Sequence, residues 1–212
     1  MKQGLALREK RIKVEDLSVS TRGPPGYGTV CASSGAACGH WYYELHVDEL
    51  SPESAFRVGW STRRSRLDVP LGSDCFSFAI RSKGGEPVAL GKRWSEFKTR
   101  IVEGDVIGCE LVLPTTSTFD DDLTGFDVEN PEFPGVYESS FMRFYLNDER
   151  IGPELKNLSR GEYFPAVSLY GRQKLRFDFD IEKFGAKSAL QMHVDQRKPK
   201  KRPLTFIPRG LK

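Results

Sequence analysis

Cysteines and histidines are the side chains of this sequence best suited to metal binding or catalysis, and their spacing argues against both. The chain has three histidines, and its four cysteines form no C-x-x-C pair; they are Cys31, Cys38, Cys75 and Cys109. Zinc sites need clustered thiolates and imidazoles. His40 and His46 lie near no nucleophile-elbow motif and no paired carboxylates. We therefore expect no metal, no cofactor and no enzymatic activity, and four free thiols in a reducing cell interior.

Two arginines point instead to anion binding. Arg57 and Arg81 each lie in a run in which apolar side chains alternate with others. Because successive side chains of a strand point to opposite faces, both guanidinium groups should face away from the apolar side. A charge-assisted bond from arginine to a carboxylate contributes roughly 1.5–3 kcal/mol when partly desolvated. The alternative is that both arginines form exposed ion pairs with Glu44 or Glu110, which contribute about 0–1 kcal/mol each.

The elements that must position these arginines are β-strands, because apolar residues recur with a period of two. Strands are predicted at 41–47, 56–60, 76–81, 106–113, 141–146, 164–170 and 174–179. Turn residues separate them, for example Asn147-Asp148. This pattern predicts an all-β fold, an antiparallel sandwich of two sheets. Residues 115–135 show no strand pattern and are expected to form a long acidic loop between two strands.

Composition indicates one soluble domain with an uneven charge distribution. The 212 residues are 38% hydrophobic and 29% charged, with a net charge of +3, and we find no candidate membrane span or signal peptide. Residues 57–93 hold eight basic and three acidic residues, whereas residues 115–135 hold six acids and no base. Residues 197–212 hold seven basic residues and no acid. We expect one domain over 1–195 and a basic C-terminal segment over 196–212.

Two basic clusters lie outside the predicted strands. Arg63, Arg64 and Arg66 form a loop that either steers an acidic partner or simply keeps the domain soluble. The second cluster comprises Arg197, Lys198, Lys200, Lys201 and Arg202. It is typical of a nuclear-import signal, and contact with DNA phosphates is the second interpretation. The third is a basic C-terminus with no role.

Five strings in a fixed order resemble the SPRY domain family. They are GHWYYE at 39–44, RVGWS at 57–61, GDVIGC at 104–109, FYLNDERIG at 144–152 and YFPAVSLY at 163–170. The resemblance covers roughly residues 26–179. It implies a bent sandwich of two antiparallel sheets that binds peptides and has no catalytic activity of its own.

Further strings resemble one branch of that family, the Ash-two/Bre-two subunit of COMPASS/MLL-type histone lysine methyltransferase complexes. They lie at 5–7, 26–33, 47–50, 68–72, 76–84 and 204–208. The resemblance implies a nuclear, regulatory subunit without activity of its own. Its SPRY domain would bind an acidic segment of a WD40-propeller subunit of the retinoblastoma-binding-protein-five/Swd-one type. The pair would then stimulate a SET-domain methyltransferase that places the lysine-four mark on histone three.

The resemblance also implies a peptide-binding pocket and shows departures from the family. The pocket residues carried over are Tyr27, Arg57, Pro70, Arg81 and Lys83. Ser73 replaces an aromatic residue that the family often has, so either the pocket lacks one wall or another side chain, such as Phe56 or Trp94, supplies it. The family's insertion is lysine-rich in animals, whereas here it is acidic. The helix that binds a Dpy-thirty-type dimer has no counterpart pattern.

Two further functions stay open at this point. One is a SPRY substrate receptor of a ubiquitin ligase, which would need an adaptor-binding box or RING segment that these residues lack. The other is direct binding of DNA or nucleosomes through the basic C-terminal segment.

Overall fold

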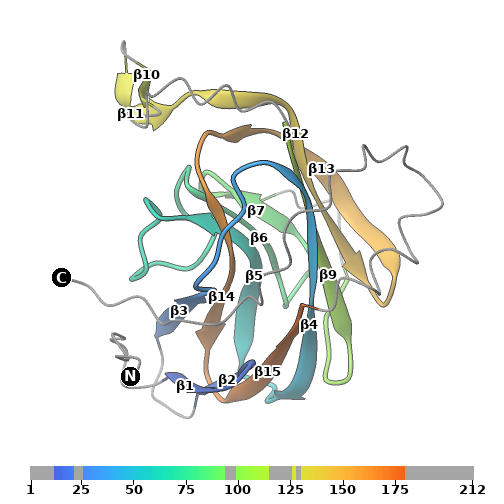
Figure 1. Ribbon diagram of the computed structural model, residues 1–212. Helices are drawn as coiled ribbons and strands as arrows, with labels where there is room; N and C mark the ends of the chain where they lie inside the picture. The colour runs from blue at the N-terminus through green and yellow to red at the C-terminus, as the bar shows by residue number, and fades with distance from the viewer. Residues whose placement is uncertain (1–11, 22–25, 94–98, 115–125, 128–129, 180–212) are drawn as a thin grey trace.

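Most of the described part of the chain forms two antiparallel sheets, and a short pair of strands forms a third (Figure 1). The computed structural model describes residues 12–21, 26–93, 99–114, 126–127 and 130–179. The seven-stranded sheet has the order β1 (Ile12–Glu15), β2 (Ser18–Thr21), β15 (Gln173–Asp178), β4 (Gly39–Leu50), β9 (Val106–Leu113), β12 (Val136–Leu146) and β13 (Glu149–Ser159). The six-stranded sheet has the order β3 (Tyr27–Cys31), β14 (Tyr163–Tyr170), β5 (Ala55–Thr62), β6 (Ser77–Arg81), β7 (Pro87–Ala89) and β8 (Lys92–Arg93). The predicted all-β sandwich is therefore confirmed.

The core lies between the sheets, and the predicted alternation builds it. On β4 the buried apolar residues are Tyr43, Leu45 and Val47, and on β5 they are Phe56, Val58 and Trp60. The ring centroids of Tyr43 and Trp60 are 5.1 Å apart, edge to face, so the two sheets meet through these aromatic side chains. The Tyr43 hydroxyl donates a hydrogen bond to the carbonyl of Gly59 at 2.6 Å, which satisfies the only polar atom of that side chain.

The acidic insertion lies where the sequence predicted, between β9 and β12, but it is not free of strands. β10 (Phe126–Asp127) and β11 (Asn130–Pro134) form a separate two-stranded antiparallel sheet with a shifted register. The two strands are only two and five residues long, which is too short to leave a recognisable alternation in the sequence. The prediction of a strandless loop over 115–135 was therefore wrong in this respect.

Several predictions fall on residues outside the described ranges. These include most of the insertion, Trp94, the predicted domain end at residue 195 and the basic segment 196–212. Within the described residues, no helix is long and apolar enough to span a membrane. All four cysteines are free thiols, as predicted, and Cys31 and Cys109 are buried.

Candidate functional site

Arg57 and Arg81 lie side by side on the face of the six-stranded sheet that points away from the core. They are register partners across β5 and β6, and both are half-buried. Their neighbours Phe56, Val58 and Ile80 are buried in the core, which confirms the orientation expected from alternation. Because Phe56 points inward, it does not supply the pocket wall that Ser73 lacks, and that one of the alternatives was wrong, whereas Trp94 lies outside the described residues.

The Arg57 guanidinium is held in place but is not paired with a carboxylate at salt-bridge distance in the described residues. Its Nη1 donates to the carbonyl of Leu71 at 2.7 Å and to Ser73 Oγ at 3.4 Å. Its Nε is buried without a hydrogen-bond partner. Burial lowers the pKa of Arg57, and the nearby Arg81 and Arg93 lower it further, while Tyr27 opposes them. The group is therefore a partly desolvated cation with a donor to spare, which is the state that an incoming carboxylate stabilises.

Tyr27 forms an aromatic floor beside this cation. Its ring centroid lies 5.7 Å from the Arg57 guanidinium carbon and 5.3 Å from the ring centroid of Tyr170. Tyr170 faces Tyr27 in the β3–β14 register. Tyr170 was not predicted as a site residue, although it ends the strand that pairs with the strand of Tyr27. The contact between the two tyrosines depends on the pairing of β3 with β14, and the sequence pattern did not indicate this pairing.

A loop before β6 covers part of this face and carries Pro70. The Leu71 amide donates to Ser168 Oγ at 2.9 Å, and Ser168 in turn shares a 2.7 Å hydrogen bond with Thr29. Leu71 itself is buried in a small apolar cluster on this side of the sheet. Gly72 has a φ of +78°, and a Cβ there would lie 2.5 Å from the carbonyl oxygen of Val88, so only glycine fits this turn. Pro70 is thus fixed directly before the residue whose carbonyl accepts from Arg57.

The two remaining pocket residues differ in where they lie. Arg81 Nη1 contacts both carboxylate oxygens of Glu86 at 3.3 Å. The alternative partners Glu44 and Glu110 lie on the other sheet, so the predicted alternative was wrong in its partners, although Arg81 does form an ion pair with Glu86. Lys83 is exposed and lines a separate cavity of about 300 Å³ together with Arg100. The structure therefore brings Tyr27, Arg57, Pro70 and Arg81 together and places Lys83 at their margin.

The basic loop Arg63, Arg64 and Arg66 connects β5 to β6, as predicted, but its charges are partly neutralised. Arg63 forms an ion pair with Glu162 at 3.3 Å, and Arg66 forms one with Asp68 at 2.7 Å. The Arg64 guanidinium lies 4.4 Å from the centroid of the Phe76 ring. All three arginines are exposed.

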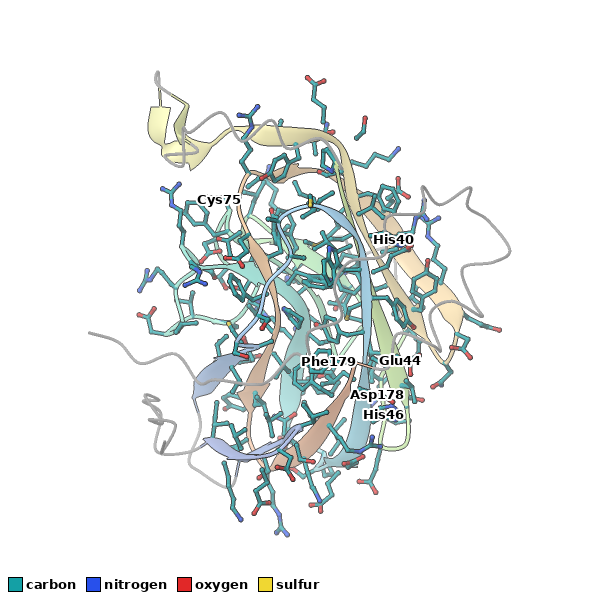
Figure 2. All side chains as sticks on the ribbon, viewed as in Figure 1. His40, Glu44, His46, Cys75, Asp178 and Phe179 are labelled. Atoms are coloured by element: carbon teal, nitrogen blue, oxygen red, sulfur yellow. The ribbon has the colours of Figure 1, made fainter. Side chains whose placement is uncertain are left out.

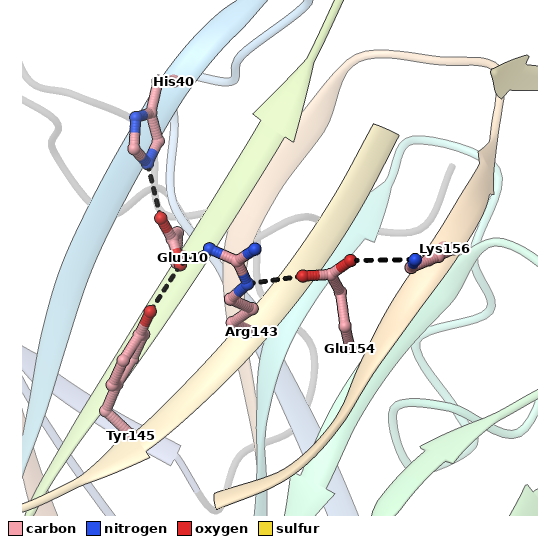
Figure 3. Close-up of polar contacts among 6 residues, drawn as sticks. All are labelled: His40, Glu110, Arg143, Tyr145, Glu154 and Lys156. Atoms are coloured by element: carbon pink, nitrogen blue, oxygen red, sulfur yellow. Dashed lines mark hydrogen bonds and ion pairs between the residues drawn. The ribbon is translucent and has the colours of Figure 1, made fainter. Parts of the chain in front are cut away.

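A second polar network lies on the outer face of the seven-stranded sheet (Figure 3). Its centre is Glu110, which accepts from Tyr145 at 2.6 Å and hydrogen-bonds His40 Nε2 at 2.7 Å. Burial would raise the pKa of Glu110, but these hydrogen bonds and Arg143 outweigh it and lower the pKa. Burial and the neighbouring Glu110 raise the pKa of Tyr145 to about 12. The network links β4, β9 and β12, and Arg143 extends it to Glu154 on β13.

Comparison with known proteins agrees with this geometry. Residues 40–117 match the family model described as SPRY domain. The crystal structure of a human SPRY domain superposes with a TM-score of 0.57 at 20% identity, covering 81% of this chain and 96% of that one. The SPRY domain of human HERC1 gives a TM-score of 0.58 at 16% identity, covering 80% and 92%. These structures support the fold.

Several curated proteins are similar to this chain in sequence. The chain is 26% identical over 202 residues to the Set1/Ash2 histone methyltransferase complex subunit ASH2 of Drosophila melanogaster, covering 82% of this chain and 35% of that protein. It is 27% identical over 187 residues to the subunit ash-2 of Caenorhabditis elegans, covering 71% and 31%. The Set1 complex component ash2 of Schizosaccharomyces pombe is 33% identical over 81 residues, covering 37% and 12%. The chain thus spans about a third of the length of the two animal relatives. Residues 40–117 thus resemble a SPRY domain, and the chain is similar in sequence to the ASH2 subunits and COMPASS components of animals and fungi.

Proposed function

We propose that this chain is a non-catalytic scaffold subunit of a Set1/COMPASS-type histone methyltransferase complex, and that it binds an acidic peptide on the outer face of its six-stranded sheet. The observation that carries the proposal is the pairing of Arg57 with Arg81 beside Tyr27. Like charges directly opposite each other destabilise a sheet, so the pair favours an anion between them. The names of the relatives support membership of the complex.

The chemistry of the face fits a short peptide that combines acidic and apolar side chains. Carboxylates would bind the spare donors of Arg57 and Arg81, while an apolar side chain would pack on Tyr27, Tyr170 and Pro70. Two charge-assisted contacts would contribute roughly 3–6 kcal/mol together, and packing of the apolar side chain must supply the rest of the free energy that offsets the entropy of association. Lys83 lies at the margin, where it would extend the contact for a longer acidic segment.

The partner that fits is an acidic segment of the WD40-propeller subunit of such a complex. By holding this subunit beside the SET-domain methyltransferase, the chain would favour the productive arrangement of the catalytic subunit, which is a shift of populations rather than chemistry. The complex acts on chromatin, so the proposed location is the nucleus. Binding of a Dpy-thirty-type dimer would need a helix beyond the described residues.

The test is a titration of a labelled acidic propeller-subunit peptide against the wild type and Arg81→Ala. We expect Arg81→Ala to weaken binding by at least tenfold. Arg176→Ala is the matched control, because Arg176 is a partly exposed arginine on the other sheet. Equal affinities of the wild type and Arg81→Ala would overturn the assignment of the pocket. A methyltransferase assay with reconstituted subunits then tests stimulation separately from peptide binding.

A further inference from the structure

Three potential metal ligands converge on the outer face of the seven-stranded sheet. Glu44 and His46 are two residues apart on β4 and so lie on the same face, and Asp178 on β15 is the register partner of Glu44. Figure 2 shows the three side chains gathered at one end of the sheet. One ligand atom from each residue lies within 4.8 Å of the other two. The sequence predicted no metal site from cysteine and histidine spacing, because these ligands come from strands far apart in the chain.

The separations in this cluster suit a shared ion better than direct hydrogen bonds. His46 Nε2 lies 3.9 Å from Glu44 Oε2 and 3.7 Å from Asp178 Oδ2. It is buried and has no hydrogen-bond partner. By contrast, His40 Nε2 is 2.7 Å from Glu110, a normal hydrogen bond. Two ligands bound to one zinc ion at about 2.1 Å with a tetrahedral angle are about 3.4 Å apart, so only a small adjustment is needed.

The charge and exposure of the cluster also suit a divalent ion. Two carboxylates and a neutral imidazole carry a charge of about −2, which a dication neutralises. The side chains of Glu44, His46 and Asp178 are 7%, 21% and 21% exposed, so the site is sheltered and still leaves an open position for water. The Tyr42 hydroxyl donates to the other Glu44 oxygen at 3.2 Å and would orient that ligand.

Within the described ranges, Arg176 lies close to the cluster and pairs with a residue outside it. Arg176 faces His46 across the β4–β15 pairing. Its Nε lies 3.6 Å from Asp48 Oδ2, at the far side of His46 along β4. We propose that Glu44, His46 and Asp178 bind a divalent transition-metal ion, with zinc as the ion that best matches one imidazole and two carboxylates. The bound ion would fasten β15 to β4 and stabilise the domain.

The test measures thermal unfolding of the full chain with and without zinc chloride. At a zinc concentration of about a hundred times Kd, the wild-type Tm should rise by roughly 5–10 °C. His46→Gln and Asp178→Asn should each abolish most of this rise, and calorimetry should give one ion per wild-type chain. His40→Gln is the matched control and should keep the full rise, because His40 is bound to Glu110 outside the cluster.

His46→Gln and Asp178→Asn approximately preserve side-chain size. A cooperative unfolding transition of each variant without zinc shows that it is folded. Absence of a zinc-dependent rise in the wild type would overturn the proposal. So would an equal rise in His46→Gln, which would place the metal at another site. If one variant fails to unfold cooperatively, the other decides.

Discussion

Arg57 on β5 lies directly opposite Arg81 on β6, so two guanidinium groups share one side of the six-stranded sheet. Their local partners differ: Arg57 donates to the Leu71 carbonyl, whereas Arg81 contacts Glu86. The Leu71 carbonyl offsets only part of the charge of Arg57, because it is a dipole and not an anion. If a carboxylate binds there as proposed, it meets donors that these local contacts already hold in place, which lowers the entropic cost of binding.

Replacement of Arg57 by lysine tests whether geometry or charge alone attracts the peptide. Arg57→Lys keeps the positive charge but loses the planar guanidinium group. In the wild type that group donates to the Leu71 carbonyl and has further N–H donors for a carboxylate. We expect affinity for the acidic peptide to fall by about tenfold with little change in its salt dependence. Arg63→Lys, at an exposed arginine of the neighbouring loop, should bind like the wild type in the same titration. Unchanged affinity of Arg57→Lys would show that charge is sufficient.

Replacement of Tyr27 separates the ring from its hydroxyl. The ring packs beside Tyr170 and the Arg57 guanidinium. The hydroxyl also interacts with Arg57 and opposes the fall in the pKa of Arg57 that burial causes, so two variants are needed to separate these contributions. Tyr27→Phe should bind the peptide within about twofold of the wild type, while Tyr27→Ala should lose roughly tenfold or more. Peptide titration together with thermal unfolding distinguishes a lost anchor from a lost fold. Equal binding by Tyr27→Ala would remove this residue from the site.

The basic loop is predicted to act on the rate of association. Arg63, Arg64 and Arg66 are exposed, and two of them have carboxylate partners, so their long-range effect on an acidic partner is moderate. In a variant with all three replaced by glutamine, stopped-flow measurements should show association slowed by roughly 3–10-fold at low salt. The dissociation rate should not change, and the difference should vanish at high salt. A faster dissociation would mean that the loop contacts the bound peptide.

The orientation of the two arginines was predictable, because strict alternation on β5 and β6 determines which face each residue takes. The same alternation places Phe56 in the core, so proposing it as a pocket wall conflicted with the pattern itself. What alternation does not determine is which strands become neighbours. The contact between Tyr27 and Tyr170 needs β3 to pair with β14, and the position of Pro70 depends on the hydrogen bond from Leu71 to Ser168.

Strand β13 is a second feature that alternation in the sequence does not predict. Asn147 and Asp148 have φ values of 49° and 73°, and the predicted turn there joins β12 to β13. β13 itself was not predicted, because Gly152 has a φ of +72° and the register with β12 shifts twice, which destroys a regular alternation. The cluster of Glu44, His46 and Asp178 likewise depends on the pairing of β4 with β15.

Removal of residues 197–212 tests the proposed nuclear-import role of Arg197, Lys198, Lys200, Lys201 and Arg202. The acidic peptide should bind the shortened chain as tightly as the full chain, because the proposed site lies on β3, β5, β6 and the loop before β6. A fluorescent fusion of the shortened chain should lose its nuclear enrichment, whereas a full-length fusion with Arg81→Ala should keep it. Persistence of nuclear enrichment after the deletion would assign import to another segment or to a partner.

Glu110 should contribute to stability in a pH-dependent way. Its folded-state pKa lies below the model-compound value of 4.5, because hydrogen bonds from His40 and Tyr145 outweigh its burial. A depressed pKa means that the folded state favours the carboxylate, so the stabilisation is complete above about pH 5 and is lost as the pH falls through the folded-state pKa.

Glu110→Gln should lower the free energy of unfolding by about 2–4 kcal/mol near pH 7, since it breaks a buried charged network. Urea unfolding at a series of pH values should show that the difference from the wild type narrows on acidification below pH 4.5. Glu53→Gln, at an exposed position, should follow the wild type throughout. A difference between wild type and Glu110→Gln that stays constant with pH would mean that packing of the side chain, and not its charge, stabilises the sheet.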